Sequence, residues 1–191
     1  MANKIKYGLK NVYYAVATIA DDGSATYDTP VKFPGAVSLS LEAQGNTDPF
    51  YADNIKYYVG VSNNGYEGDL EMARVIDSFK TDVLGFVADK NNVMYEDAGA
   101  EAVHFALLFQ FEGDKKATRH VMYNCTATRP AASSQTKGEN VEPQTETVTI
   151  SAGTIYVDAI KKDIPKAETT EETPVATYDG WFDAVYIPSA Q

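Results

Sequence analysis

Apolar and polar residues alternate along much of this chain, most clearly between residues 104 and 128. Odd positions are apolar in both halves of that stretch, while polar residues stand at 104, 110, 112, 120, 124 and 126. A period of two is typical of β-strands with one face on a core. The polar segment 112–116 contains Gly113 and predicts a turn between two strands. The core side of this hairpin would consist of Phe105, Leu107, Phe109, Phe111, Val121, Tyr123 and Cys125.

The numbering of these apolar residues also predicts how the two strands pair. Residues paired across an antiparallel ladder share a face, so two odd-numbered apolar rows require paired numbers with an even sum. A three-residue loop, Gly113 to Lys115, meets this condition and pairs Leu107 with Val121 and Phe105 with Tyr123. A two-residue turn would place the Phe row opposite polar positions. We expect the hairpin to lie in the middle of a sheet.

Other segments repeat the strand pattern at short intervals. Apolar alternation or short apolar runs predict strands at 9–18, 31–41, 55–61, 66–72, 86–87, 93–95, 145–151 and 154–160. The row Ile55, Tyr57, Val59 and Val61 is followed by Asn63-Asn64-Gly65, a sequence that favours a hairpin turn. The only helix predicted lies at about 74–84, where apolar residues recur every three or four positions before Gly85. The expected fold is therefore mainly β, a β-sandwich or barrel-like structure with one flanking α-helix and long loops.

Polar segments separate these elements. We expect an N-terminal arm at 1–8, a long polar connection at 43–54, an exposed loop at 129–144 and a mobile Thr-, Glu- and Pro-rich segment at 161–177. The stretch after 177 contains Trp181 and Phe182 and is too apolar to be a free tail. It should dock on the rest of the structure, and we see no boundary for a second domain within 1–191.

Charge and cysteine content exclude several classes of function. The chain has 16 Lys and Arg against 27 Asp and Glu, a net charge of −11, which argues against tight binding to a phosphate backbone. Its single cysteine excludes an internal disulfide and a multi-Cys metal site. No apolar run approaches the ~20 residues needed to cross a bilayer, and no apolar stretch follows the N-terminal lysines as in a secretory signal.

Candidate chemistry is sparse. In the predicted register the two histidines, His104 and His120, lie about 13 Å apart, too far to share a metal, and the register supplies no carboxylate beside either. The motifs of serine and zinc hydrolases and of phosphate-binding loops are missing. We therefore expect no catalytic, cofactor or metal site. Tyr51, Tyr57 and Tyr58 allow a different interpretation, because exposed tyrosines in a β-sandwich can stack on sugars in a glycan- or receptor-binding module.

Taken together, several segments resemble the major tail protein (tail tube) family of long-tailed bacteriophages and prophages of Gram-positive bacteria. The resemblance covers most of the chain in family order, although no single motif carries it. The matching segments include GLKNVYYA at 8–15, TPVKFPGAVSLSLEAQG at 29–45, FYADNIKYY at 50–58, NNGYEGDLEMA at 63–73, HFALLFQFEGDKKATRHVMYNCTATRP at 104–130, VEPQTETVTI at 141–150 and WFDAVYIP at 181–188.

The resemblance implies a single tail-tube domain that works as a structural subunit and not as an enzyme. In such tubes subunits join edge to edge in hexameric rings, their sheets form a continuous β-barrel around a channel, and the rings stack. The implied partners are further copies of the chain and other tail proteins, such as the tape measure and terminator proteins. DNA would pass through without tight binding, and no membrane would be involved. The implied location is the virion tail, with assembly in the host cytoplasm.

This implied role suggests positions for the surfaces. Cationic walls would trap DNA through its phosphates, so we expect the acidic face of 66–72, with Glu67, Asp69 and Glu71, to line the bore. An ordinary solvated outer face is the competing interpretation. Contacts with a neighbouring ring or subunit are expected from the arm and the 43–54 connection, through Lys4, Lys6, Gln44, Asn46, Thr47, Asp48 and Asp53.

Overall fold

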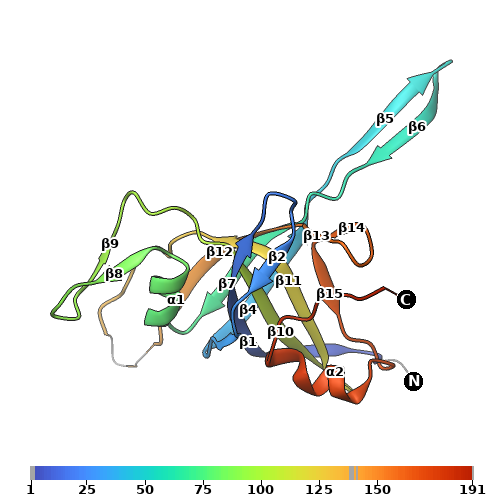
Figure 1. Ribbon diagram of the computed structural model, residues 1–191. Coiled ribbons are helices and arrows are strands. Elements are labelled where there is room, and N and C mark those ends of the chain that lie inside the picture. The colour runs from blue at the N-terminus through green and yellow to red at the C-terminus, as the bar shows by residue number, and fades with distance from the viewer. Residues whose placement is uncertain (1–2, 138–139, 141, 191) are drawn as a thin grey trace.

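Antiparallel strands make up most of the regular structure in the computed structural model, which describes residues 3–137, 140 and 142–190 (Figure 1). The predicted mainly β, sandwich-like fold is confirmed. The strands are β1 Lys6–Ile19, β2 Ala25–Tyr27, β3 Val31–Lys32, β4 Ala36–Ala43, β5 Thr47–Ala52, β6 Ile55–Val61, β7 Tyr66–Met72, β8 Phe86–Ala88, β9 Met94–Glu96, β10 Phe105–Gly113, β11 Thr118–Ala127, β12 Glu146–Gly153, β13 Ile155–Val157, β14 Lys162–Ile164 and β15 Lys166–Glu168. The helices are α1 Asp77–Asp82, α2 Val175–Asp179 and the 3₁₀-helix η1 Gly180–Phe182.

One large sheet organises the molecule. Its strand order is β2-β1-β10-β11-β12-β7-β4, with β3 paired to β1 and β15 paired to β11. The β10–β11 hairpin lies in the middle, as its alternating pattern predicted. Strand β11 has two partners on its outer side: residues 124–127 pair with β12, and residues 120–122 pair with β15. The sheet therefore divides along β11.

The predicted register of the β10–β11 hairpin is wrong. Leu108 pairs with Val121 and Phe109 with His120, which is the arrangement that the parity argument excluded. A register shift follows between Phe105 and Leu107. The argument failed because it assumed one buried face, whereas residues 105–110 of β10 are all buried. With apolar contacts on both sides, burial no longer selects a single parity.

Two apolar clusters cover the two faces of this hairpin. The first contains Phe105, Leu107 and Phe109 and continues into β7, β12 and α1. Within it Phe79 of α1 packs at ring-centroid distances of 4.5 Å from Phe33 and 5.5 Å from Phe105. The second cluster lies on the opposite face of the hairpin and includes Ala106, Leu108, Val121, Tyr123, Ile155, Val157 and Trp181. The predicted core-hairpin residues are thus divided between two clusters.

Helix α1 lies inside the predicted 74–84 segment but is shorter. Val75, Phe79 and Val83 are buried, which is the spacing that predicted the helix. Gly85 follows with φ +73°, and a Cβ there would lie 2.4 Å from the Ala100 Cβ. The short helices α2 and η1 were not predicted, because they are too short to show an apolar period.

Residues 36–72 form one long antiparallel hairpin (Figure 1). Strand β4 pairs with β7, β5 pairs with β6, and the ladder continues between them through Gln44 N donating to Gly65 O at 2.9 Å. The turn lies at Asp53 and Asn54, both with positive φ. The hairpin turn predicted at Asn63-Asn64-Gly65 is therefore wrong, as is the interpretation of 43–54 as a loop. We call residues 44–64 the β5–β6 arm.

Two other segments differ from a simple loop description. Residues 161–177, expected to be mobile, contain β14, β15 and the start of α2, and β15 pairs with β11. The N-terminal arm is strand β1 from Lys6 onward, and residues 1 and 2 lie outside the described residues. In the 129–144 segment the described residues contain no helix or strand.

Candidate functional site

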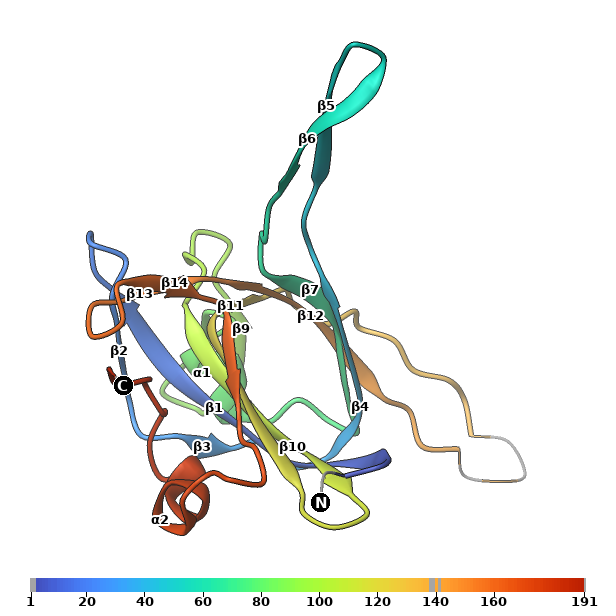
Figure 2. The same cartoon turned by 90° about the vertical axis from the view of Figure 1, so that its right-hand side faces the viewer.

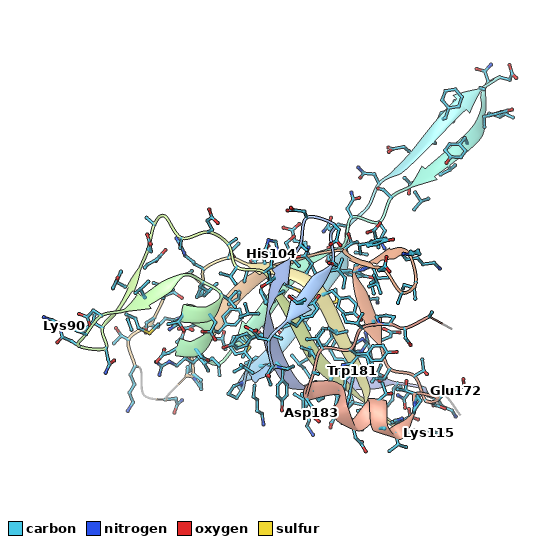
Figure 3. The ribbon with its side chains drawn as sticks, in the orientation of Figure 1. Lys90, His104, Lys115, Glu172, Trp181 and Asp183 are labelled. Carbon is cyan, nitrogen blue, oxygen red and sulfur yellow. The ribbon has the colours of Figure 1, made fainter. Side chains whose placement is uncertain are left out.

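The β5–β6 arm extends away from the body of the molecule (Figure 2). Its large apolar side chains are strongly exposed: Phe50 is 61% exposed, Tyr57 71%, Tyr58 67% and Val61 78%. Side chains on the arm stand in open space (Figure 3). The apolar row predicted at 55–61 exists, but it covers no core. A contiguous exposed apolar surface of this kind marks a site of interaction with another molecule.

Five of the seven polar residues predicted to make contacts with neighbours lie on the same arm. Each of the five in the 43–54 segment is exposed, namely Gln44, Asn46, Thr47, Asp48 and Asp53. Asp53 is at the tip, and Asp48 pairs with Gly60 across the ladder. These side chains and the exposed aromatic rings therefore lie on the same hairpin, so a partner of the arm would meet both.

The described part of the N-terminal arm is tied to the β10–β11 turn. Asn3 Nδ2 donates to Lys116 O at 2.6 Å, and Lys4 N donates to Asp114 Oδ1 at 2.8 Å. Lys4 and Lys6 are exposed, and Lys6 already pairs with Gly113 in the sheet. The structure thus places both lysines at the β10–β11 turn and separates them from the β5–β6 arm.

The outward face of β4, β7 and β12 is acidic and rich in hydroxyl groups. Cross-strand pairs share a face, and the pairs of Glu67, Asp69 and Glu71 extend this face over both neighbouring strands. Its members are Ser38, Ser40, Glu42, Glu67, Asp69, Glu71, Thr147, Thr149 and Ser151. None of them is a cation. Leu70 and Met72 point to the other side and are fully buried.

Hydroxyl groups, rather than cations, hold two of these carboxylates. Ser38 Oγ donates to Glu71 Oε2 at 2.8 Å and Thr145 Oγ1 to Glu71 Oε1 at 2.7 Å. Thr149 Oγ1 donates to Asp69 Oδ1 at 2.7 Å. The hydrogen bonds from Thr145 and Ser38 lower the pKa of Glu71 below its ordinary value. The negative charge is therefore kept and its position is fixed.

Strand β4 is the last strand of the sheet path. Within the described residues it pairs only with β7, so one side of its backbone has no strand partner. Val37 on this strand is 51% exposed. An unpaired edge of this length is a template for pairing with another chain.

A cleft of about 550 Å³ opens between β4 and the β10–β11 pair. Apolar and polar residues line it in similar proportion, and the charged groups include Lys6, Lys166 and Glu168. Lys166 Nζ lies 5.2 Å from the centre of the Tyr66 ring. The whole lining is Lys6, Leu39, Ser40, Leu41, Tyr66, Phe109, Phe111, Thr118, His120, Met122, Lys166 and Glu168.

The histidines are separate, but one does have a carboxylate beside it. His120 Nδ1 lies 3.3 Å from Glu168 Oε2, which corrects the expectation from the wrong register. Burial lowers the pKa of His120, and Glu168 opposes this shift only in part. His104 Nδ1 instead lies 2.7 Å from Asn124 Oδ1.

Neither histidine belongs to a constellation that suggests chemistry. Among the described residues no group of three or more His, Cys, Asp or Glu is placed to hold a metal. Cys125 is fully buried, and burial raises the pKa of its thiol to about 12, so the thiolate nucleophile is not available at neutral pH.

The C-terminal segment docks through Trp181, which is only 2% exposed (Figure 3). Its Nε1 donates to His120 O at 3.3 Å, and its ring stacks on Tyr186 at 5.3 Å. Phe182 stacks on Tyr13 of β1 at 4.9 Å. The segment therefore closes the second core cluster. No helix in the described part of the chain is both long and apolar enough to cross a bilayer.

Comparison with models of protein families identifies the family of the chain. A family model described as phage tail tube protein matches residues 2–183, nearly the whole chain. The chain belongs to the phage tail tube protein family. A search of curated proteins found no match.

Membership of this family gives the chain a structural role in the phage tail. Its members are tail subunits that assemble with copies of themselves and with other tail proteins. The exposed arm, the acidic face and the unpaired edge of β4 are therefore surfaces of a tail subunit.

Proposed function

We propose that this protein assembles into stacked hexameric rings that enclose a channel through which DNA passes. The observation that carries the proposal is the β5–β6 arm, whose apolar side chains are exposed on a hairpin that, within the described residues, forms no ladder with the strands of the large sheet. Leaving Phe50, Tyr57, Tyr58 and Val61 in water would forgo roughly 1.5–3 kcal/mol of burial each. Assembly provides the buried environment that the single chain lacks.

The unpaired edge of β4 is the argument for contacts within a ring. Strand β4 offers unpaired backbone groups along one side, and a neighbouring subunit can satisfy them with an edge strand of its own. At the other end of the sheet path lies β2, and the short strand β3 pairs with β1. Repetition of one edge-to-edge contact closes into a ring when the rotation per subunit divides a full turn.

The acidic face is the argument for the proposed channel wall. Glu67, Asp69 and Glu71 face away from the core, and the hydroxyl groups around them supply no positive charge. DNA phosphates that meet such a wall are repelled rather than bound, so the DNA can slide. An outer, solvated position of the same face is the competing arrangement, and charge reversal separates the two.

The channel proposal is tested with the triple variant Glu67→Lys, Asp69→Lys and Glu71→Lys. The control reverses three exposed acids elsewhere, Asp21, Asp28 and Glu101, to lysine. We expect both proteins to form tubes, and only the first tube to retain short DNA in a salt-dependent manner. Equal DNA retention by both tubes would place the acidic face outside the bore.

The assembly proposal is tested by negative-stain electron microscopy of concentrated protein. Wild-type protein should give rings or tubes with sixfold class averages. The arm variant Tyr57→Asp/Val61→Asp should stay a folded monomer, because two charges cannot be buried at the interface without partners. The matched control Val175→Asp changes a residue that is 73% exposed at the start of α2 and should assemble normally. A wild-type protein that stays monomeric at every concentration would refute the proposal.

The proposed setting follows from the same role. Tape measure and terminator proteins would contact the tube, and assembly would take place in the host cytoplasm. The subunit would act as a mechanical part and catalyse no reaction. Co-purification of tubes with these two partners from infected cells tests the assignment.

A glycan- or receptor-binding role is the second candidate. Tyr51, Tyr57 and Tyr58 are 59%, 71% and 67% exposed, as sugar-stacking residues must be. Binding of a sugar array by a stable monomer would favour this role, whereas tubes without sugar binding would favour the first.

A further inference from the structure

Rings that stack head to tail need two different complementary surfaces on the same chain. The β5–β6 arm is one of them, because it projects from the body and exposes apolar side chains on both faces. Pro49 and Val59 share one face, and Phe50 and Tyr58 share the other. A projecting arm with exposed aromatic rings would fit a concave site with apolar walls on the body of another copy.

The cleft between β4 and the β10–β11 pair has the required shape and chemistry. Leu39 and Leu41 form one wall and Phe109 and Phe111 the other. Three of these four side chains, Leu39, Leu41 and Phe111, pack against the first core cluster yet remain only partly buried. An apolar occupant would complete their burial. The cleft has a volume of about 550 Å³.

Charge also matches the two surfaces. The cleft contains two lysines, Lys6 and Lys166, and one carboxylate, Glu168. The arm carries two carboxylates, Asp48 and Asp53, and one lysine, Lys56. The cleft thus carries one net positive charge and the arm one net negative charge, a match that would favour correct docking and raise the rate of association.

The β8–β9 hairpin is a weaker candidate for the receiving site. It also exposes apolar residues, with Val93 60% and Tyr95 52% exposed. However, it projects from the body as the arm does (Figure 1), and its charges are Asp89, Lys90 and Glu96, which repeat the negative sign of the arm. Shape and charge both favour the cleft.

We propose that the cleft between β4 and the β10–β11 pair receives the β5–β6 arm of a second copy, an inference that rests on the proposed function. The arm cannot fill its own cleft, because it leads away from the body (Figure 2). Each subunit thus donates one arm and accepts one. The arm aromatics serve as anchors in a pocket, which is where the binding free energy of an interface concentrates.

Cysteine cross-linking tests this docking directly. Tyr57→Cys is placed on the arm of a mass-tagged chain and Thr118→Cys in the cleft of an untagged chain, while the buried Cys125 does not react. After the two variants are assembled together and exposed to a mild oxidant, a tagged–untagged disulfide dimer is expected. The control replaces Thr118→Cys by Thr18→Cys, on an exposed β1 residue that does not line the cleft, and should give none. Cross-linking to Thr18 instead of Thr118 would overturn the proposal.

Filling the cleft provides a second test. Thr118→Trp puts an indole where the arm would dock, and Thr18→Trp is the matched control. We expect the first to leave the melting temperature of the monomer nearly unchanged and to raise the concentration needed for tubes at least tenfold, with no effect from the second. If wild-type protein forms tubes, Thr118→Trp forms them equally well and the cross-link is missing, the docking site is wrong although the proposed function stands. If wild-type protein forms no tubes, the proposed function itself fails.

Discussion

The two hairpins β10–β11 and β5–β6 contain similar types of residue but have opposite environments. Both are antiparallel and rich in aromatic and β-branched residues, and both show alternation of apolar positions. Phe105 and Leu107 of the first have no exposed surface, whereas Phe50 and Tyr57 of the second are 61% and 71% exposed. The difference shows what an apolar pattern can predict. It indicates that a surface is suited to burial, but not whether the same chain or another molecule buries it.

Neighbouring strands produce this difference. The β10–β11 hairpin has β1 on one side and β12 and β15 on the other, and apolar clusters cover both of its faces. In the part of the chain that the structure describes, strands β5 and β6 pair only with one another. A two-stranded hairpin is marginally stable in water, so the arm depends on the ladder that continues into β4 and β7. Its apolar surface can stabilise an assembly but adds little to the folded monomer.

Truncation of one aromatic residue in each hairpin is the sharpest way to break this comparison. Phe105→Ala should lower the free energy of unfolding by about 3–5 kcal/mol, because it leaves a cavity between two buried layers. Tyr57→Ala should change it by less than about 0.5 kcal/mol. Urea denaturation of dilute monomers measures both. A large effect of Tyr57→Ala would mean that the arm packs on its own body.

The C-terminal segment extends the comparison to a region that does bury its aromatic residue. Trp181→Ala should cost about 3 kcal/mol, since the indole is enclosed in the second cluster and donates to His120 O. Val175→Ala, on the same segment but exposed, is the control and should be nearly neutral. Thermal unfolding separates the two, and equal melting temperatures would show that the segment is not docked in solution.

The junction between arm and body offers a smaller effect. Gly65 has φ +91°, and a Cβ there would lie 2.0 Å from Ala152 O. Gly65→Ala should therefore cost about 2 kcal/mol and tilt the arm, because backbone atoms must move. At Gly60 a Cβ would meet nothing closer than 3.8 Å, so Gly60→Ala should cost less than about 0.5 kcal/mol. Denaturation of both variants, with tube yield as a second measurement, tests whether the arm must leave the body at a fixed angle.

The smallest expected effect concerns pH. His120 is largely buried, and its pKa lies below the ordinary value of 6.5, with Glu168, Lys166 and Lys6 acting on it. The unfolded chain therefore takes up a proton near pH 6.5 while the folded chain does not. Lowering the pH from about 6.5 then favours unfolding, until the folded His120 is protonated as well. His120→Phe, which can keep the stack on Phe109, should make the free energy of unfolding, measured by urea denaturation, less dependent on pH below about 6.5. An unchanged slope of this free energy against pH would show that His120 does not control it.

Much of the secondary structure followed from local patterns. The strands at β1, β6, β7, β10, β11 and β12 and the position of α1 were predictable, because a period of two or of three to four residues is a property of adjacent residues. The hairpin register was not. Burial of β10 on both faces and a register shift near Phe105 depend on distant elements, namely α1, β13 and Trp181, which no local pattern describes.

The candidate surfaces divide in the same way. The acidic face of β7 was visible in the sequence as alternation of Glu67, Asp69 and Glu71 with apolar residues, but its extension over Ser38 and Thr149 required the strand pairing. The polar residues of the 43–54 segment were predicted to make contacts, whereas the arm that carries them was mistaken for a loop. The cleft was not predicted, since its walls come from strands more than 60 positions apart in the sequence.

By itself, the sequence determined that the chain is mainly β, that it is acidic and that it resembles a tail-tube subunit. Periodicity and composition depend only on the order and type of the residues, so they can be read without knowing which residues are in contact. The tertiary structure alone decided which apolar rows are covered, because coverage depends on what the chain brings opposite each row. Apolar clusters cover both faces of β10 and β11, whereas the apolar side chains of β5 and β6 stay exposed. The first hairpin therefore stabilises the monomer, and the second is available to its neighbours.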